Sequence, residues 1–232
     1  MSDQDLIRLR KEYEDRKKRA KNKDVYSYWN KSSLFTIQQR QRKLVSTLKK
    51  YLDTSKQDRS ILEIGCGAGG VLNEYMTLGL SSSKLFGIDL LHDRLVEAHE
   101  KFPKFGLSCA DGQKLPYPNE YFDVVLQYTA FTSVLDDRIK QNMAHEMKRV
   151  LKEDGVIIWY DFWLNPTNPQ TKGIKPKEIR SLFPGCEYHF NKVTLAPPLA
   201  RRIVPFSWNV ALILESFKIF NSHYLALIKN IK

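Results

Sequence analysis

Three glycines and a preceding acid are the residues of this chain whose spacing most directly indicates chemistry. They stand in the run Glu63-Ile-Gly65-Cys66-Gly67-Ala68-Gly69, which follows the apolar run Ser60-Ile-Leu and precedes a helical pattern that starts near Val71. Glycine adopts backbone torsions that a side chain forbids, and it lets a ligand lie against the main chain at a helix N-terminus. The run predicts a nucleotide-like pocket, and residues 65–70 also satisfy the dinucleotide pattern G-x-G-x-x-G.

Acidic residues follow the neighbouring predicted strands. Residues 84–89 end in Asp89, 26 residues after Glu63 and close to the spacing of about 20 residues expected for a ribose-binding carboxylate. Residues 106–109 run into Asp111, whose carboxylate could accept a hydrogen bond from an adenine amine. Open α/β sheets bind ligands at the carboxyl ends of their strands, so these acids are expected around one pocket. The alternative is that Asp89 and Asp111 only cap the next turn or helix.

The series resembles the class I S-adenosylmethionine-dependent methyltransferases, whose pattern combines E/D-x-G-x-G-x-G, an acid after the second strand, an acid after the third, and Phe-Asp at the fourth. The resemblance spans Ser60 to about Phe162 and implies S-adenosylmethionine as cofactor. By similarity, the implied cofactor-binding residues are Glu63, Gly65, Cys66, Gly67 and Gly69 at the methionine moiety, Asp89 and Leu90 at the ribose, Ala110, Asp111 and Gly112 at the adenine, and Gln127 and Tyr128 beside the sulfonium.

Three further segments, residues 34–40, 159–162 and 194–201, are similar to a poorly characterised bacterial branch often associated with surface-polysaccharide gene clusters. This second resemblance implies O-methylation of a glycan, a lipid-linked sugar or a related small acceptor. Other classes stay open. An NAD-dependent oxidoreductase would use Asp89 equally well, although no Tyr-x-x-x-Lys pair stands where it would be expected. A non-catalytic cofactor-binding scaffold is a further alternative.

A nucleic-acid methyltransferase is the main alternative, because the basic residues gather at the two ends of the chain. Residues 1–50 carry 15 Lys and Arg against 6 Asp and Glu, residues 51–190 carry 16 against 19, and residues 191–232 carry 6 against 1. Basic ends suggest an anionic partner or membrane surface, and a solvated helix face is the plainer reading. Against nucleic acid, residues 126–130 read Leu-Gln-Tyr-Thr-Ala and lack the Asn/Asp-Pro-Pro-Tyr signature of base-amino methylation.

The elements that must position these residues alternate between strands and helices. Strands are expected near residues 60–62, 84–89, 106–109, 121–127, 156–161, 187–195 and 222–229, and helices over 1–23, 34–52, 136–152, 176–183 and 207–220. Gly155 is expected to close the helix over 136–152. The resemblance implies a Rossmann-like α/β fold, a mostly parallel seven-stranded sheet of order 3-2-1-4-5-7-6 with helices on both faces.

We expect a basic helical cap or lid over residues 1–55 and the S-adenosylmethionine-binding methyltransferase domain over 56–232, with a helical insertion at about 196–221. The longest late uncharged run, Ile203 to Leu214, has 12 residues and is too short to span a bilayer. No signal-peptide core stands at the start. These features predict a cytoplasmic protein, with peripheral contact at an anionic membrane as one option and the oligomeric state left open.

Asp161 is the predicted catalytic residue, because it ends the fifth strand and so faces the cofactor edge. Transfer from a sulfonium needs alignment and exclusion of water, and a hydroxyl acceptor also needs a base. The alternative is that Asp161 only fixes the next loop. Aromatic rings stack on sugars, and arginine clamps anions. The predicted substrate-binding residues are therefore Tyr26, Tyr28, Trp29, Arg40, Arg201 and Arg202. The alternative for the first four, Trp29 above all, is a hydrophobic plug that joins the N-terminal helices to the core, and the alternative for Arg201 and Arg202 is a solvated turn.

The three cysteines, at 66, 109 and 186, have no paired spacing, so neither disulfides nor a zinc site is indicated. Each is expected to be a small buried residue. The five histidines offer no metal-ligand spacing, and no metal is expected.

Overall fold

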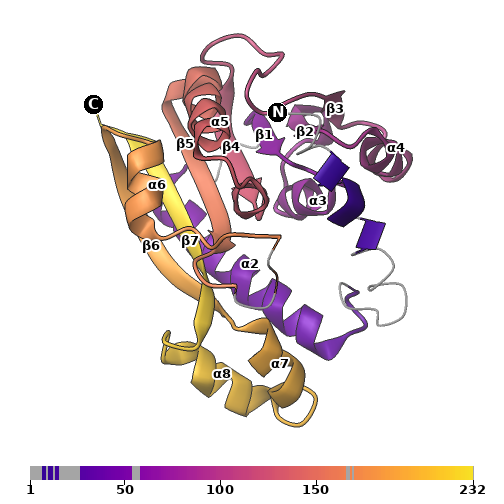
Figure 1. Ribbon diagram of the computed structural model, residues 1–232, viewed down its shortest axis with the longest axis vertical. Coiled ribbons are helices and arrows are strands. Elements are labelled where there is room, and N and C mark those ends of the chain that lie inside the picture. Colours follow the sequence, from indigo (N-terminus) through magenta and orange to yellow (C-terminus); the bar gives the residue numbers. More distant parts are fainter. Residues whose placement is uncertain are drawn as a thin grey trace.

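The computed structural model describes residues 7, 8, 10–12, 14, 15, 27–53, 58–165, 168 and 170–231 of the 232 in the chain. Its centre is a seven-stranded sheet with the order β3-β2-β1-β4-β5-β7-β6 (Figure 1). The strands are β1 (Ile61–Ile64), β2 (Leu85–Asp89), β3 (Gly106–Cys109), β4 (Phe122–Tyr128), β5 (Leu151–Phe162), β6 (Cys186–Leu195) and β7 (Asn221–Asn230). The first five are parallel and β7 is antiparallel to both neighbours, which confirms the predicted fold class and strand order.

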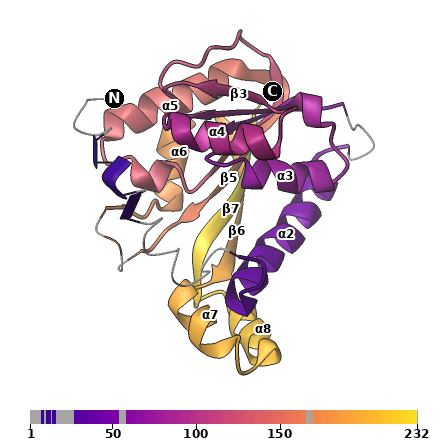
Figure 2. The same ribbon diagram turned by 90° about the vertical axis from the view of Figure 1, so that its right-hand side faces the viewer.

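Helices cover both faces of the sheet. They are α2 (Lys31–Tyr51), α3 (Gly70–Thr77), α4 (His92–Lys101), α5 (Asp137–Val150), α6 (Pro176–Leu182), α7 (Pro197–Ile203) and α8 (Trp208–Ser216), with short 3-10 turns η1 (Ser82–Lys84) and η2 (Phe131–Ser133). The described residues between 7 and 15 are helical too, in agreement with the helix predicted there. Helices α5 and α6 pack on one face, and α2, α3 and α4 on the other (Figures 1 and 2).

The two faces explain why the central strands are continuously apolar. Successive side chains of a strand point to opposite faces. In β4, Val125 joins the core under α5, while Val124 and Leu126 join the core under α2 and α3. In β5, Ile157 and Ile158 divide in the same way. A parallel strand covered on both sides therefore needs apolar residues at every position.

The end of α5 differs from the prediction. Asp136 caps its start, since the Oδ1 atom accepts hydrogen bonds from the backbone nitrogens of Arg138 (2.7 Å) and Ile139 (3.1 Å). The helix ends at Val150 and β5 begins at the next residue, so the prediction that Gly155 closes it is wrong. Gly155 instead lies where the pairing of β5 with β4 shifts register. A Cβ there would come within 2.7 Å of Leu151.

Between β6 and β7 the chain leaves the sheet and forms α7 and α8, which project at one end of the long axis (Figures 1 and 2). The sequence predicted one helix here, and α7 is a second, started by Pro197 at its first turn. The first turns of α2 contact both α7 and α8. The Ser32 hydroxyl donates a hydrogen bond to the Ala200 carbonyl (3.2 Å), and the Phe35 ring packs edge-on against Trp208.

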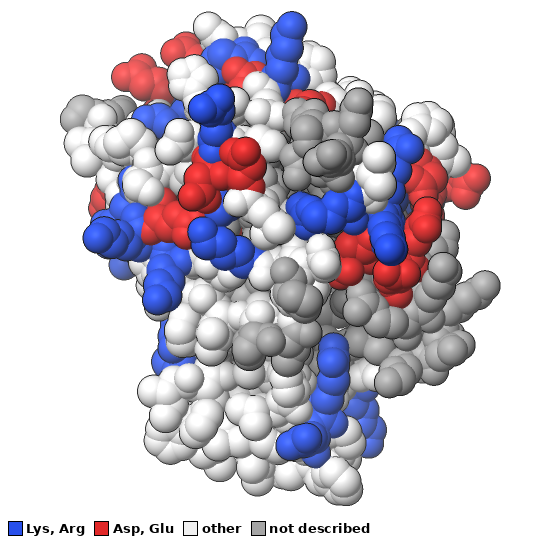
Figure 3. All heavy atoms as spheres, in the orientation of Figure 1, with Lys and Arg blue, Asp and Glu red and all other residues white. Residues whose placement is uncertain are grey.

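Figure 3 shows that acidic and basic side chains intermingle over the upper part of the molecule, whereas the projecting part around α7 and α8 is mostly uncharged. No helix among the described residues combines the length and apolar composition needed to cross a bilayer.

Candidate cofactor site

The glycine run forms the turn between β1 and α3, and its glycines are required by torsion and by space. Gly65, Gly67 and Gly69 have φ angles of 75°, 53° and 77°, in the left-handed region that other residues avoid. A Cβ on Gly65 would lie 2.9 Å from the Cβ of Ala130, and one on Gly67 would lie 2.3 Å from the Arg94 guanidinium. Space therefore excludes a side chain at Gly65, whereas the Arg94 guanidinium is the end of a flexible side chain, so Gly67 is required by its torsion.

Asp89 connects this turn to the next strand. Its Oδ2 atom accepts a hydrogen bond from the Gly67 nitrogen (2.8 Å), and Oδ1 accepts one from the Leu91 nitrogen (2.9 Å). The carboxylate therefore ties the glycine turn to the start of α4, as the capping alternative proposed. A carboxylate has about four acceptor positions. The two bonds leave capacity for a diol, and Asp89 also lines the pocket described next.

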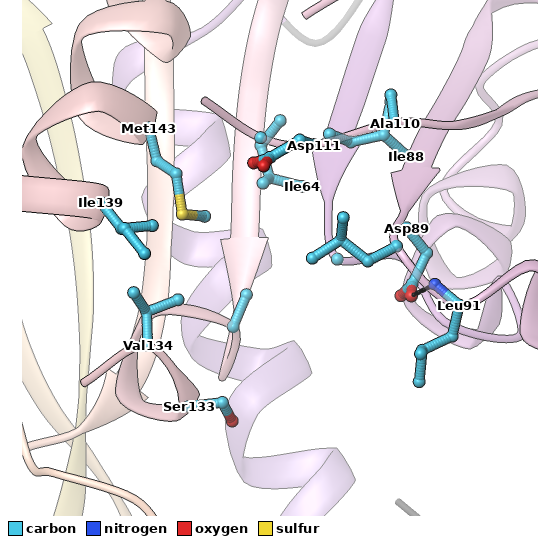
Figure 4. A pocket seen from close by; sticks show the side chains of 14 residues that line it. Ile64, Ile88, Asp89, Leu91, Ala110, Asp111, Ser133, Val134, Ile139 and Met143 are labelled. Carbon is cyan, nitrogen blue, oxygen red and sulfur yellow. Dashed lines mark hydrogen bonds between the residues drawn. The ribbon is translucent and has the colours of Figure 1, made fainter. Parts of the chain in front are cut away.

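A pocket opens at the carboxyl ends of β1, β2 and β3 and is closed on its other side by η2 and α5 (Figure 4). Its cavity volume is about 70 Å³. Figure 4 shows Val134, Ile139 and Met143 on one side and Asp89 on the other. The lining residues are Ile64, Gly65, Ile88, Asp89, Leu90, Leu91, Ala110, Asp111, Gly112, Ala130, Ser133, Val134, Ile139 and Met143.

Half of the predicted cofactor residues line this pocket. These are Gly65, Asp89, Leu90, Ala110, Asp111 and Gly112. The pocket lining does not include Glu63, Cys66, Gly67, Gly69, Gln127 and Tyr128. The Cys66 sulfur instead lies against Gly87 in the core, where an added Cβ would meet it at 2.6 Å. The roles expected at the methionine moiety and the sulfonium stay predictions.

The prediction missed the side of the pocket built by η2 and α5. Ile139 and Met143 stand four residues apart, so they lie on one face of α5, and both line the pocket. Their spacing marks an apolar face in the first two turns of α5, but how far this helix reaches over the sheet edge depends on tertiary packing.

Asp111 sits at the end of β3 with both carboxylate oxygens engaged. Oδ1 accepts from the Gln113 backbone nitrogen (2.9 Å) and Oδ2 from the Gln113 side-chain amide (3.1 Å). Partial burial alone would raise the pKa of Asp111, but the hydrogen bonds that the carboxylate accepts outweigh it and lower the pKa. Asp111 is therefore an ionised acceptor at the pocket, and its contact with an adenine amine stays a prediction.

Asp161 and Gln127, at the ends of β5 and β4, hold η2 in place. The Asp161 carboxylate accepts from the Thr132 nitrogen (3.1 Å), the Thr132 hydroxyl (2.7 Å) and the Phe162 nitrogen (2.9 Å). Gln127 Oε1 accepts from the nitrogens of Ala130 and Phe131. Burial raises the pKa of Asp161 to about 7, although the bonds from Thr132 oppose the shift. Asp161 is 1% exposed and absent from the pocket lining, so its catalytic role stays a prediction, and its contacts match the loop-fixing alternative.

Arg40 belongs to a buried polar cluster on the α2 face of the sheet. It forms an ion pair with Glu74 of α3, and its guanidinium lies 5.3 Å from the ring centres of both Tyr128 and Tyr160. Burial would lower the pKa of Arg40, but Glu74 and the tyrosines outweigh it and raise the pKa. Burial raises the pKa of Glu74 more than Arg40 lowers it. The predicted contact of Arg40 with a substrate stays a prediction, and the structure shows the guanidinium engaged inside the protein.

The other predicted substrate residues lie away from the pocket. Tyr26 is outside the described residues. Tyr28 and Trp29, in the turn before α2, are 57% and 92% exposed, so the alternative of a Trp29 plug against the core is wrong. Arg201 and Arg202 are exposed on α7. Their contacts with an acceptor stay predictions.

Two of the three cysteines are buried as predicted, whereas Cys109, at the end of an edge strand, is exposed, which corrects the prediction for that residue. Within the described part of the chain, no three or more His, Cys, Asp or Glu side chains come close enough together to hold a metal ion.

Comparison with known proteins agrees with this geometry. Residues 62–159 match the family model described as "Methyltransferase domain". The chain is 34% identical over 120 residues to a protein named sterol 4-C-methyltransferase of Caenorhabditis elegans, covering 49% of this chain and 34% of that one. It is 28% identical over 148 residues to 27-O-demethylrifamycin SV methyltransferase of Amycolatopsis mediterranei, covering 61% and 52%. The matches thus span a third to about half of these relatives.

Solved structures share the fold. A S-adenosylmethionine-dependent methyltransferase of Methanosarcina mazei gives a TM-score of 0.58 at 18% identity, covering 80% of this chain and 98% of that one. Geranyl diphosphate C-methyltransferase of Streptomyces coelicolor, solved with S-adenosyl-L-homocysteine, gives 0.58 at 14% identity, covering 81% and 76%.

Residues 62–159 thus match a methyltransferase domain, and the strand order is that of the class I S-adenosylmethionine-dependent methyltransferase fold, as the strand-end motifs predicted. The residues present fit the cofactor. The turn has glycine where a Cβ would collide with Ala130, Asp89 keeps acceptor capacity for a diol, and Ile88 and Met143 give the pocket apolar walls.

Proposed function

We propose that this protein uses S-adenosylmethionine to methylate an oxygen of a glycan, a lipid-linked sugar or a related small acceptor. The observation that carries the cofactor assignment is the meeting of the glycine turn, Asp89 and Asp111 at one pocket. Three strand ends that act independently as caps would have no reason to border one cavity.

When bound, the cofactor supplies a methyl group already activated on a sulfonium. What remains for the protein is to bind, align and exclude water. Asp89 would hold the ribose diol, Asp111 and Gly112 would border the adenine, and Gln127 with Asp161 would keep η2 closed over the pocket. Asp161 would then act as a positioning residue, because its oxygens already accept three hydrogen bonds.

The names of the relatives support an acceptor with a large apolar part. They include sterol 4-C-methyltransferase and the phthiotriol/phenolphthiotriol dimycocerosates methyltransferases of mycobacteria, and a structural neighbour was solved with geranyl diphosphate. A lipid-linked sugar combines such a part with the hydroxyl groups that O-methylation needs. The polysaccharide-associated resemblance of residues 34–40, 159–162 and 194–201 supports the sugar.

Titration calorimetry tests the cofactor assignment. We expect binding of S-adenosylmethionine and S-adenosylhomocysteine, and weaker binding or none of NAD. Asp89→Ala should weaken donor binding about tenfold to hundredfold, because a hydrogen bond to a charged group contributes about 1.5–3 kcal/mol. Glu97→Gln, an exposed acid on α4, is the matched control and should bind as the native protein does. Absence of donor binding at millimolar concentration, or preference for NAD, would refute the proposal.

A methyl-transfer assay tests the acceptor. The protein is incubated with methyl-labelled donor and, separately, with lipid-linked oligosaccharide, free oligosaccharide and tRNA. Label in the lipid-extractable sugar that survives mild base is expected for an ether. Label in tRNA alone would replace the proposal with nucleic-acid methylation.

A further inference from the structure

The projecting end of the molecule, defined as the α7–α8 tip (residues 196–220), exposes large apolar side chains. Phe206, at the turn between the helices, is 90% exposed, and Phe217 and Ile219, after α8, are 60% and 71% exposed. Val210 and Ile213 of α8 add 46% and 57%. Single exposed apolar residues are common, whereas five within 14 residues are a patch that marks an interaction surface.

Helix α8 shows why this patch is not explained by packing. Ala211 faces the small core that joins α7, α8 and Phe35, and it is fully buried. Val210, Ile213 and Phe217 follow at spacings of three and four residues, so they form a second apolar stripe on the opposite side. A helix with apolar side chains on two sides normally has both sides covered, in a core or in lipid. Here one side is covered and the other faces outward.

Charge favours an anionic partner for the tip. It holds the basic residues Arg201, Arg202 and Lys218 and one acid, Glu215. Glu215 is turned inward with a side chain 15% exposed, where it pairs with Lys218 at 2.7 Å. Both arginines are exposed, and no carboxylate within the described ranges lies at ion-pair distance from them. The projecting part in Figure 3 shows basic and uncharged atoms without acidic ones.

The tip also stands at the edge of the sheet where the cofactor pocket opens. The chain leaves β6 at Leu195 and returns to β7 at Asn221, close to His223, which pairs with Phe162 at the carboxyl end of β5. The pocket is at the same edge, beside the ends of β1 and β2. Trp29, 92% exposed, precedes the helix whose first turn contacts α7. An amphipathic indole of this kind favours a membrane interface.

We propose that the α7–α8 tip inserts into the interface of an anionic lipid bilayer. Phe206, Ile213 and Phe217 would enter the boundary between headgroups and acyl chains, while Arg201 and Arg202 would contact lipid phosphates. A projecting surface that carries apolar side chains, and arginines without a carboxylate partner among the described residues, matches a charged planar interface, and a second copy would have to bury like charges against each other. The inference goes beyond the proposed function and does not require it.

Vesicle flotation tests the proposal with the full chain. We expect the protein to float with phosphatidylcholine vesicles that contain phosphatidylglycerol, and far less with phosphatidylcholine alone. Phe206→Ser with Phe217→Ser should lower partitioning by about tenfold or more, from the lost apolar burial. Arg201→Gln with Arg202→Gln should lower it about fivefold per arginine, with a weaker dependence on salt.

Matched controls separate the tip from general surface properties. Val96→Ser with Ile231→Ser removes exposed apolar side chains elsewhere, and Lys104→Gln with Lys114→Gln removes exposed charges elsewhere, and both should leave partitioning unchanged. Loss in the controls equal to loss in the tip variants would overturn the proposal. So would the absence of flotation, or sedimentation showing a dimer that the tip variants abolish. Donor binding by the Phe206 and Phe217 variant should stay native, which keeps this test distinct from the cofactor test.

Discussion

Replacing Gly65 by alanine tests whether the glycine turn is built as described. The residue has a φ of 75°, and an added Cβ would lie 2.9 Å from the Cβ of Ala130, which borders the pocket. Ala130 has no flexible end that could move aside. The new methyl group can therefore be accommodated only by a shift of the turn or of the start of η2, and both line the pocket.

The magnitude has two parts. An alanine in the left-handed region costs about 1–2 kcal/mol. A contact that forces backbone shifts in a packed site costs about 1–3 kcal/mol more. We expect Gly65→Ala to lower the free energy of unfolding by about 2–5 kcal/mol, a large fraction of the total of about 5–15 kcal/mol for a domain. Donor binding should weaken at least about tenfold, because the shifted turn borders the pocket.

Gly70→Ala is the matched control. Gly70 begins α3, has no atom within 4 Å of an added Cβ and is not in the left-handed region. It is also the last glycine of the dinucleotide pattern. Alanine there should stabilise the protein by about 0.4–1 kcal/mol, since it reduces the entropy of the unfolded chain and favours the helix. Donor affinity should not change.

Urea denaturation and titration calorimetry on both variants give the result. The reasoning is refuted if Gly65→Ala unfolds and binds as the native protein does, or if Gly70→Ala is the more damaging change. A second change, Ala130→Gly, removes the opposing Cβ. Added to Gly65→Ala, it should recover the steric part of the loss and leave the torsional part, about 1–2 kcal/mol.

Three further predictions concern buried ionisable side chains. Arg40→Met should lower the free energy of unfolding by about 3–5 kcal/mol, because Glu74 is left buried without its ion-pair partner. Adding Glu74→Gln to this variant should recover part of the loss. Urea denaturation curves in which the double variant is no more stable than Arg40→Met would contradict this prediction. The pKa of Asp161 is about 7 in the folded protein and 3.8 ordinarily, so the stability that the protonated carboxyl contributes is lost as pH rises. The free energy of unfolding of the native protein should fall relative to that of Asp161→Asn by up to about 4 kcal/mol between pH 4 and 8. A difference between the two proteins that does not change with pH would refute this prediction. Burial, and then Arg40, lower the pKa of His223 from 6.5 to about 3, so the folded protein resists protonation of this ring. The free energy of unfolding of the native protein, measured by thermal unfolding, should fall by about 2 kcal/mol relative to that of His223→Gln between pH 7.5 and 5. Stability curves of the two proteins that run parallel over this pH range would exclude this prediction.

Much of the fold could be predicted because the strands of a covered parallel sheet are short and continuously apolar. The predicted strands near residues 121–127 and 156–161 lie within β4 and β5, apart from one residue at the start of the first. Boundaries that depend on tertiary contacts were harder. Gly155 resembles a helix stop in sequence, yet it serves the register shift between β4 and β5. Helix α7 is a short helix that begins with two prolines, and it is held by α2, more than 160 residues earlier.

The candidate site likewise contains some residues that could be placed from the sequence and others that could not. Asp89 and Asp111 could be placed because strand ends share one edge and the spacing of the acids follows the strands. Met143 could not, since its place depends on how far α5 reaches over that edge. The partnership of Arg40 with Glu74 was also invisible, because α2 and α3 are separate in sequence and meet only across the sheet face. Arginine at a predicted site edge therefore suggested ligand binding, where the structure shows internal pairing.

The fixed contacts around the pocket have a consequence for how the two reactants enter. Asp89 ties the glycine turn, and Asp161 with Gln127 ties η2, through hydrogen bonds that form without any ligand. These ties fix the glycine turn and η2 on either side of the pocket. We expect the acceptor to approach along the remaining part of the edge, past the ends of β5 and β7. The α7–α8 tip projects from the same side, so a surface that binds the tip would also lie beside the path by which the acceptor reaches the donor.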